Sequence, residues 1–265
     1  MQGTSGARRH VLLLGHGISY SASPDMHNAA FQALGMDWTY ELLDVPSEEL
    51  ASAVRRLREV DVAGANVTIP HKISVIDHLD SVDPEALRAR AVNTIAKEAG
   101  RLVGSNTDVA GIRAAIAEVG LEPRGADAVI LGAGGSARAA AVALDGAHVT
   151  FVARRPGEVD VPGRVVAWDD ASWPKHARSA DLLLNATPLG RRDEMPLRPN
   201  ALPRDGAVID LVYVTGGTPL VRKARSLGMP TADGWGILLA QGARSFEIWT
   251  GKPAPLEAMR QTLPE

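Results

Sequence analysis

Two serines early in the chain have the type and spacing of ligand-binding residues. The stretch SASPDMHNAAF places Ser21 and Ser23 two positions apart, immediately before a proline. Because alternate residues of an extended chain project to the same side, we expect the two hydroxyl groups to face one region. A purely structural interpretation stays open for Ser23, since serine followed by proline and an acid is a common helix start with the serine as N-cap. A helix start explains a serine at position 23 but not at position 21. The second interpretation is therefore that the two serines bind a ligand.

Amide and hydroxyl side chains accompany two charged residues further along the first half. In GANVTIPHK, Asn66 and Thr68 share one face of an extended segment, and Lys72 follows in the first turn of an expected helix. The segment AVNTI contributes Asn93, and GSNTD ends in Asp108. Each charge has an ordinary alternative, because a solitary lysine is commonly a solvated surface residue and an acid suits the positive end of a helix dipole. Taken alone, neither charge identifies a reaction.

A glycine-rich turn in the second half indicates a nucleotide. Gly132, Gly134 and Ala137 satisfy the pattern G-x-G-x-x-[G/A] between an apolar strand at 128–131 and an alanine-rich helix. Glycine lets the backbone approach a pyrophosphate, and the exposed N–H groups and dipole of the helix favour its negative charge. A tight turn with no ligand is the alternative. The residues expected to bind the cofactor here are Gly132, Ala133, Gly134, Gly135, Ser136 and Ala137.

The strand after this turn ends in a way that favours NADP over NAD. The segment HVTFVARR ends about twenty residues after the first glycine, where an NAD-binding domain carries an acid for the ribose hydroxyl. Here Arg154 and Arg155 follow Ala153 instead. Guanidinium groups match a 2′-phosphate through charge-assisted and bidentate contacts. The alternative is a solvated arginine pair on a loop.

The elements that must position these residues alternate between strand and helix. This alternation is typical of an α/β protein with a largely parallel sheet. A loop rich in Gly and Pro, GLEPRGAD, precedes the glycine turn and indicates a boundary between two domains. The expected strands are 10–14, 38–43, 64–68, 92–96, 101–105 and 128–131, and the expected helical stretches are 24–34, 47–59, 107–119 and those that begin near 71 and after 84.

The composition excludes several classes of protein. With 265 residues, 45% hydrophobic and 22% charged, the chain has the make-up of an ordinary globular protein of one large or two moderate domains. A net charge of -3 gives no electrostatic reason to expect nucleic acid or an anionic membrane as a partner. The absence of cysteine excludes disulfides, thiolate metal sites and a cysteine nucleophile, and the histidines and acids show no metal-ligand spacing. The apolar run VLLLG is too short for a signal sequence or a membrane span, so we expect a cytoplasmic protein that needs no metal.

Together, these segments resemble the shikimate dehydrogenases and their quinate/shikimate relatives. They follow one another in the order of that family over nearly the whole chain: SASPDMHN, NVTIPHK, AVNT, GSNTD, GAGGSARAA, NATPLG, DLVY, DGWGILLAQGA and FEIWTGKPAP. The resemblance implies two α/β domains, a substrate-binding catalytic domain at 1–112 and a Rossmann-type NADP domain at 113–236, with C-terminal helices at 237–265 that return to the first domain. It also implies a cleft between the domains, whose closure would exclude water.

The resemblance assigns roles to individual residues. It implies that Ser21, Ser23 and Tyr213 bind the substrate carboxylate. The residues implied to line the ring hydroxyls and the reacting carbon are Thr68, Lys72, Asn93, Asp108 and Gln241. The residues implied to contact NADP beyond the glycine turn and the arginines are Thr187, Leu211 and Gly234.

The implied reaction is the reversible, NADP-dependent reduction of 3-dehydroshikimate to shikimate, a step of aromatic amino acid biosynthesis by way of chorismate. Hydride transfer to a ketone places negative charge on its oxygen, so a nearby cation that can also donate a proton stabilises the charge and completes the alcohol. Lys72 is the candidate, since a lysine side chain is an ammonium at neutral pH, and Asp108 would orient it and fix a substrate hydroxyl. The positive charge of the lysine takes the place of the zinc that could otherwise supply it.

Several positions depart from the family pattern. Gly17 and Tyr20 stand where the family commonly has proline and histidine, and Arg191 and Ile237 replace methionines. The cofactor strand ends in Ala-Arg-Arg rather than the usual Asn-Arg-Thr. None of these changes removes a candidate catalytic group, but they leave open the choice among shikimate, quinate and aminoshikimate.

Two other functions remain open at this point. A methylenetetrahydrofolate dehydrogenase would share the two-domain plan and a lysine, although the paired serines and the NTD segment would then have no carboxylate to serve. A non-catalytic NADP-binding protein is the other alternative, and the presence of both the lysine and the aspartate argues against it. The oligomeric state is open as well, and the chain could form a homodimer.

Overall fold

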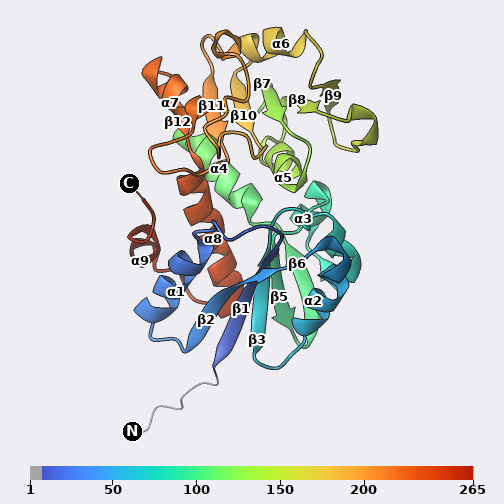
Figure 1. Cartoon of the computed structure of the whole chain (residues 1–265), viewed down its shortest axis with the longest axis vertical. Helices are drawn as coiled ribbons and strands as arrows, with labels where there is room; N and C mark the ends of the chain where they lie inside the picture. The colour runs from blue at the N-terminus through green and yellow to red at the C-terminus, as the bar shows by residue number, and fades with distance from the viewer. Residues whose placement is uncertain (1–7, 265) are drawn as a thin grey trace. The chain divides into compact units, whose positions relative to one another are not determined.

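The computed structural model describes residues 8–264, and these residues form two α/β units, each built on its own six-stranded sheet (Figure 1). Unit 1 contains the residues up to Thr107 together with residues 239–264. Unit 2 contains residues 108–238. The α/β class expected from the alternation of strands and helices is confirmed.

A mixed sheet forms the centre of unit 1, with the strand order β2-β1-β3-β5-β6-β4. The first strand, β1, pairs in parallel with β2 and β3, whereas β5 runs antiparallel to β3 and β6, and β4 is parallel to β6. The strands are β1 (Arg9–Gly15), β2 (Trp38–Asp44), β3 (Val62–Val67), β4 (Ser81–Val82), β5 (Thr94–Glu98) and β6 (Arg101–Ser105). The helices are α1 (Ser23–Ala33), α2 (Leu50–Arg56), α3 (Pro84–Ala89), α9 (Leu256–Arg260) and the part of α8 (Gly234–Thr250) from residue 239 on, with short 3₁₀ helices η1 (Ser47–Glu49) and η2 (Ser74–His78).

The two faces of this sheet carry different cores, because side chains along a strand alternate between faces. Ala65 and Val67 of β3 lie in an apolar core shared with α2, η2 and α3. Asn66, between them, lies on the opposite face and hydrogen-bonds to α8, which together with α1 covers that face (Figure 1). The same face holds aromatic rings in contact, among them Phe31 of α1 tilted against Phe246 of α8. Asn66 and Thr94 therefore face α8, where both hydrogen-bond to Ser245.

Unit 2 contains a parallel sheet with the strand order β12-β11-β10-β7-β8-β9. Numbered from β7, this is the order 6-5-4-1-2-3 of Rossmann-type dinucleotide-binding domains. The strands are β7 (Asp127–Leu131), β8 (His148–Ala153), β9 (Arg164–Ala167), β10 (Leu182–Asn185), β11 (Ala207–Asp210) and β12 (Thr231–Ala232). The helices are α4 (Asp108–Glu118), α5 (Gly135–Ala143), α6 (Trp173–Ser179), α7 (Pro219–Ser226) and the start of α8, with 3₁₀ helices η3 (Pro156–Glu158) and η4 (Pro199–Ala201).

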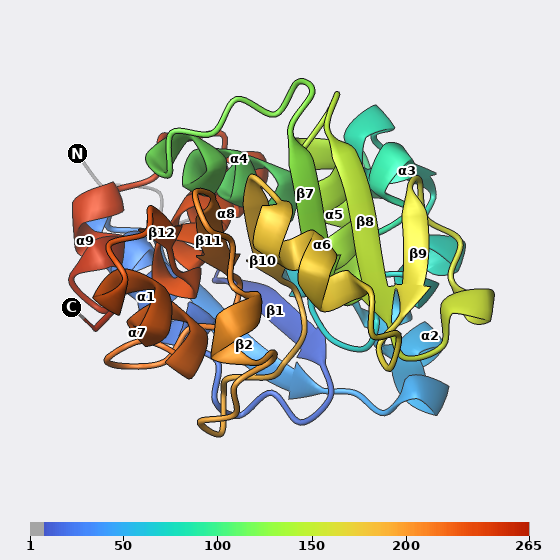
Figure 2. The same ribbon diagram turned by 90° about the horizontal axis from the view of Figure 1, so that it is seen from above.

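Helices cover both faces of the unit 2 sheet, with α5 on one side and α6 on the other (Figure 2). Trp173 and Ala177 of α6 pack with Leu220 and Ala224 of α7 in an apolar core on the strands. Because both faces are covered, the strands DAVIL and LLLN are apolar runs rather than alternating sequences. In such sheets ligands bind at the carboxyl ends of the strands, where the strand order reverses. Here that point lies between β7 and β10.

Two local expectations were wrong, and the bounds of a third element are displaced by two residues. The helix expected at 47–59 is η1 followed by α2, and after Arg56 the chain continues as single turns with bonds from residue i to i−3. The helix expected from about His71 is a turn followed by η2, because the carbonyl of Lys72 accepts the N–H of Val92 and so cannot continue a helix. Lys72 thus lies in a turn. The strand expected at 92–96 is β5, which begins at Thr94.

Within residues 8–264, no helix is long and apolar enough to span a bilayer. Over the same range, no group of three or more His, Asp or Glu side chains is placed to hold a metal ion.

Candidate active site

The paired serines lie at the start of α1, but in a geometry that differs from the expected one. Ser23 is the first residue of α1, and the N-cap position is Ala22, whose φ of -83° and ψ of -4° are helical. The prediction that Ser23 is the N-cap was therefore wrong, and the chain between the serines is not extended. Ser23 is buried, and its N–H donates to the Oγ of Ser21 at 3.3 Å. The two serines are adjacent in space through this bond, while their contact with a carboxylate stays a prediction.

Thr68 lies where the carboxyl ends of β1 and β3 meet. Its N–H donates to the carbonyl of Leu14 at 2.8 Å, which continues the parallel pairing of the two strands. A side chain on Gly15 would overlap the methyl group of Thr68, since a Cβ there would lie 2.5 Å from it. The glycine in the stretch LLLGHG therefore allows Thr68 to pack against the end of β1.

Backbone bonds hold the turn that carries Lys72. The ring of His71 is buried and donates from Nε2 to the carbonyl of Val45 at 2.6 Å. The carbonyl of Lys72 accepts the N–H of Val92 at 2.8 Å, so the lysine backbone is one residue away from Asn93. The structure thus brings the main chains of two predicted site residues together. These bonds involve backbone atoms of Lys72, so they do not depend on its side chain.

A buried amide pair joins three of the segments that the sequence singled out. The Oδ1 of Asn93 accepts the backbone N–H of Thr107 at 2.7 Å, which fixes the amide orientation because an N–H can only donate. The Nδ2 of Asn93 is therefore the group that donates to Thr107 Oγ1 at 2.9 Å and to Gln241 Oε1 at 3.3 Å. All three residues are buried. Asp108 follows Thr107 directly, so this pair also fixes the backbone on one side of that carboxylate.

The glycine turn of unit 2 has the geometry that a pyrophosphate needs. Gly132 has a φ of +105°, and a Cβ there would lie 3.1 Å from the carbonyl of Ala186, so glycine is required. Gly134 is the N-cap of α5, and no side chain caps this helix. A Cβ on Gly134 would contact nothing within 4 Å, so the space before the helix is open. Ser136, in the first turn of α5, donates to Asp108 Oδ2 at 3.5 Å. These features fit a dinucleotide cofactor.

The arginines after β8 lie at the same edge as the glycine turn. Leu131 is paired with Val152 in the sheet, and the N–H of Gly132 donates to the carbonyl of Val152 at 2.9 Å. Arg154 follows two residues later and is exposed. Arg155 is exposed as well and forms a 3.0 Å ion pair with Glu158. Of the two, Arg155 already has a carboxylate partner.

Leu211, Tyr213 and Gly234 lie together in unit 2, where the start of α8 packs on the segment after β11. A Cβ on Gly234 would lie 2.7 Å from the carbonyl of Leu211 and from the N of Tyr213, so only glycine allows this approach. The ring of Tyr213 contacts that of Trp235 at a centroid distance of 4.8 Å. Tyr213 belongs to unit 2, whereas the serines belong to unit 1. Its predicted role with them stays a prediction.

A buried carboxylate that the sequence analysis did not single out connects the ends of β10 and β11. Asp210 is fully buried and accepts hydrogen bonds from Asn185 Nδ2 at 2.9 Å, from Thr218 Oγ1 at 2.6 Å and from the N–H of Val212 at 3.0 Å. Asn185 in turn accepts the hydroxyl of Thr187 at 2.6 Å. This network therefore sets the loops at the edge that would receive the cofactor. The sequence feature that could have predicted this network is a polar residue, Asn185 or Asp210, at the end of each apolar strand.

We expect the Asp210→Asn variant to remove one component of the pH dependence of stability. Burial raises the pKa of Asp210 to about 6, against the opposing effect of its hydrogen bonds. In the unfolded chain the carboxyl titrates near 3.9, so between about pH 4 and pH 6 the folded state binds more protons. The free energy of unfolding then falls as pH rises through this window, by at most roughly 3 kcal/mol from this group.

Asparagine has nearly the same shape and can keep the bonds, with its oxygen facing Val212 and its amide donating to Thr218. Thermal melts from pH 4.5 to 8 should therefore show the wild type losing stability relative to Asp210→Asn as pH rises. Asp80→Asn is the control, because Arg58 lowers the pKa of Asp80 to about 2 and its titration lies below this window. Parallel profiles for the wild type and Asp210→Asn would contradict the raised pKa.

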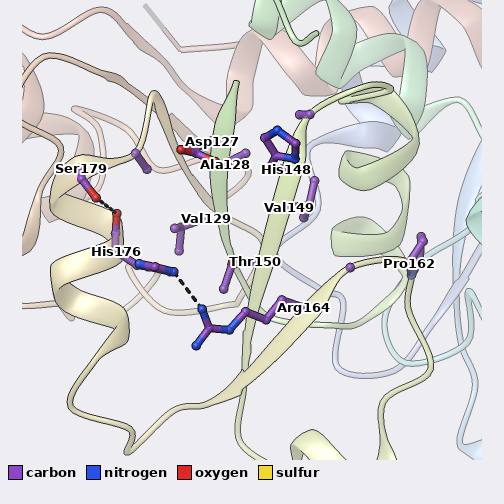
Figure 3. A pocket seen from close by; sticks show the side chains of 13 residues that line it. Asp127, Ala128, Val129, His148, Val149, Thr150, Pro162, Arg164, His176 and Ser179 are labelled. Atoms are coloured by element: carbon purple, nitrogen blue, oxygen red, sulfur yellow. Dashed lines mark hydrogen bonds between the residues drawn. The ribbon is translucent and has the colours of Figure 1, made fainter. Parts of the chain in front are cut away.

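A groove of unit 2 lies away from all predicted site residues (Figure 3). It runs beside α6 along the amino halves of β7 and β8, with Asp127 and His148 in its lining. Arg164 donates from Nη1 to Nε2 of His176 across it at 3.0 Å. Because parallel sheets bind ligands at the opposite, carboxyl ends of their strands, we do not assign this groove to the cofactor.

Comparison with known proteins shows similarity over nearly the whole chain. Residues 13–95 match the model of the shikimate dehydrogenase substrate binding domain, and residues 234–263 match that of the shikimate 5'-dehydrogenase C-terminal domain. The NADP-dependent shikimate dehydrogenase of Methanopyrus kandleri is 40% identical over 96% of this chain and 94% of its own. A crystal structure of shikimate 5-dehydrogenase from Thermus thermophilus in complex with NADP(H) and shikimate superposes with a TM-score of 0.83, at 36% identity over 96% of this chain and 98% of that chain. A ligand-free 5-ketofructose reductase of a Gluconobacter species has a TM-score of 0.81, at 33% identity over 96% and 97% of the two chains.

The parallel sheet with its glycine turn, together with the similarity to NADP-dependent shikimate dehydrogenases, shows that the chain is an NADP-dependent oxidoreductase. The similarity to this kind of enzyme extends over nearly the whole chain and over both units. The chain belongs to the shikimate dehydrogenase family.

Proposed function

We propose that the protein catalyses the reversible reduction of 3-dehydroshikimate to shikimate with NADPH, with Lys72 as the general acid and base. The observation that carries this proposal is the buried contact between Asn93, Thr107 and Gln241, which joins three segments of the chain beside the backbone of Lys72. Buried side-chain amides can both donate and accept hydrogen bonds, so they are suited to bind a ring that carries several hydroxyl groups. Relatives named NADP-dependent shikimate dehydrogenase support the same substrate pair.

The proposed chemistry is a balanced two-electron reduction. The nicotinamide of NADPH, when bound, supplies the hydride to the carbonyl carbon. The Lys72 ammonium stabilises the negative charge that develops on the carbonyl oxygen and gives it a proton, so that the ketone becomes an alcohol. In the oxidative direction the neutral amine of Lys72 takes the hydroxyl proton back. We assign Asp108 the orientation of Lys72 and the binding of one ring hydroxyl.

The remaining site residues take the roles that the family resemblance implies. Ser21, Ser23 and Tyr213 bind the carboxylate, and Thr68 joins the residues around the ring. On the cofactor side, the contacts of the glycine turn are supplemented by Arg154, Arg155, Thr187, Leu211 and Gly234. We expect the protein to be located in the cytoplasm. A homodimer stays a prediction, and we assign no residue to its interface.

A spectrophotometric assay of nicotinamide reduction tests the proposal against its alternatives. Shikimate, quinate and aminoshikimate should each be offered with NADP and with NAD, and 5-ketofructose should be offered with NADPH because a related structure carries that reductase name. Turnover of shikimate with NADP at the highest kcat/KM supports the proposal. Turnover of 5-ketofructose alone would assign a different ketone, and binding of NADP without turnover would favour a non-catalytic protein.

We expect the enzyme to prefer shikimate over quinate by about ten- to hundredfold in kcat/KM. Quinate carries an additional hydroxyl on the carbon that bears the carboxylate, so discrimination must occur beside the paired serines. Tyr20 precedes Ser21 and is 40% exposed, and its phenol is bulkier than the imidazole common at this position in the family. A phenol there crowds the additional hydroxyl.

The ratio of kcat/KM for shikimate and quinate checks this expectation, with Tyr20→His as the variant and Tyr20→Phe as the control that keeps the bulk. Tyr20→His should narrow the ratio, and Tyr20→Phe should keep it. A wild type that uses quinate as efficiently as shikimate would show that the crowding argument is wrong.

A further inference from the structure

Ser245 is a buried hydroxyl in the middle of α8, on the face that packs against the sheet of unit 1. It is 0% exposed, and four polar groups surround its Oγ. These are Asn66 Nδ2 at 3.1 Å, Thr94 Oγ1 at 2.8 Å, Thr107 Oγ1 at 2.9 Å and the carbonyl of Gln241 at 3.0 Å. A hydroxyl in this position costs free energy unless it is hydrogen-bonded, so its partners decide its contribution.

The directions of the hydrogen bonds around Ser245 follow from groups that can act in one way only. The carbonyl of Gln241 can only accept, so the Ser245 hydroxyl donates its proton along the helix. The carbonyl of Asn93 also can only accept, and it lies 3.0 Å from Asn66 Nδ2, which fixes the Asn66 amide. Asn66 Nδ2 therefore donates to Ser245, and Asn66 Oδ1 accepts the hydroxyl of Tyr40 at 2.8 Å. With its proton given to Gln241 and one lone pair taken by the Asn66 amide, Ser245 Oγ can accept from one of the two neighbouring threonine hydroxyls.

Ser245 consequently links the backbone that carries Gln241 to the threonine side chain that bonds to Asn93. On one side it bonds to the carbonyl of Gln241, one helical turn earlier in α8. On the other side it contacts Thr107, whose N–H and hydroxyl both bond to Asn93. The contact between Asn93 Nδ2 and Gln241 Oε1 spans 3.3 Å, and it depends on the distance between α8 and the strands. The serine hydroxyl holds that distance.

We propose that Ser245 is a positioning residue of the substrate site, which holds Gln241 and Asn93 in the orientation that the ring hydroxyls require. The proposal rests on the proposed function, which assigns both amides to substrate binding. Ser245 touches neither substrate nor cofactor in this arrangement and acts through the two amides. An alanine would leave the Asn66 N–H and one threonine hydroxyl with one hydrogen-bond partner fewer, and the amides would shift. Misplacement of a binding group by about 1 Å can cost about a hundredfold in rate.

The test is a double-mutant cycle between Ser245→Ala and Gln241→Ala, read by steady-state kinetics of shikimate oxidation. Ser245→Ala should raise the KM for shikimate about tenfold and lower kcat less, with the KM for NADP within twofold of the wild type. In the Gln241→Ala background, Ser245→Ala should raise the KM for shikimate by about threefold rather than tenfold, because one of the two amides through which the serine acts is gone and only Asn93 is left. If Ser245→Ala raised the KM for shikimate by the same factor in the wild type and in the Gln241→Ala background, the proposal would be overturned.

Phe246→Leu is the matched control, since Phe246 is also 0% exposed on α8 and packs on Phe31 outside the polar network. It should lower the melting temperature without raising the KM for shikimate. Ser245→Cys, which fills the volume of the serine with a weak donor, is the second variant and should raise the KM to a lesser degree. An unchanged KM in Ser245→Cys and Ser245→Ala, or an equal rise in Phe246→Leu, overturns the positioning role. A wild type that does not oxidise shikimate overturns the proposed function instead, so the two failures are distinguishable.

Discussion

Replacing Lys72 by alanine should lower kcat for shikimate oxidation by about 10²- to 10⁴-fold, the usual contribution of a general acid or base. The same side chain is assigned the proton and the stabilisation of the developing charge, so its loss removes both effects in one step. The fold should survive, because the turn around Lys72 is held by its carbonyl bond to Val92 and by the ring of His71. Stopped assays at high enzyme concentration can measure the residual rate.

The control variants separate chemistry from binding. Lys72→Met keeps the length of the side chain without its charge and should be as slow as the alanine variant. Lys252→Ala removes an exposed lysine of the same unit and should be fully active. Fluorescence titration should show NADP binding to all three variants with the affinity of the wild type. A loss of less than tenfold in Lys72→Ala would remove Lys72 from the proposed proton transfer.

The class of the fold was predictable because each unit obeys rules that act over short distances along the chain. Alternating strands and helices indicated the α/β class, and the apolar strand before the glycine turn is β7 at the centre of the parallel sheet. The errors were of two kinds, a helix start displaced by one residue and a distant contact that overrides local preference. Ser23 has the sequence of an N-cap, but the helical φ and ψ of Ala22 move the cap position by one residue. Lys72 was expected in a helix, but the N–H of Val92 occupies its carbonyl.

The site was predictable only where its residues carry a recognisable pattern. The glycine turn has such a pattern, since the spacing of its glycines follows from the conformation of the backbone. Ser245 has none, because it lies in an apolar helix and meets Asn66 across 179 positions of the sequence. Asp210 was likewise missed, although an acid at the end of an apolar strand needs buried partners. Buried polar networks depend on register and packing, which a single sequence does not display.

The cofactor preference depends on the edge of the unit 2 sheet where β8 ends. We expect the wild type to prefer NADP to NAD, and we expect Arg154→Ala to weaken NADP binding about ten- to hundredfold while NAD binding changes less than threefold. A charge-assisted hydrogen bond contributes about 1.5–3 kcal/mol, and 1.4 kcal/mol corresponds to a factor of ten. The position supports the assignment, since Gly132 is bonded to Val152 and Arg154 directly follows the end of β8, at the same edge of the sheet as the glycine turn.

Arg155→Ala is the matched control for this prediction. Arg155 differs from Arg154 by its 3.0 Å ion pair with Glu158, so a 2′-phosphate would have to compete with that carboxylate for the guanidinium. Arg155→Ala should therefore weaken NADP less than Arg154→Ala does, and Glu158→Gln should strengthen it by freeing Arg155. Dissociation constants for both nucleotides, measured by fluorescence at two salt concentrations, check the order, because the contribution of exposed charges falls with ionic strength. Equal use of NADP and NAD by the wild type would show that neither arginine reads the 2′-phosphate.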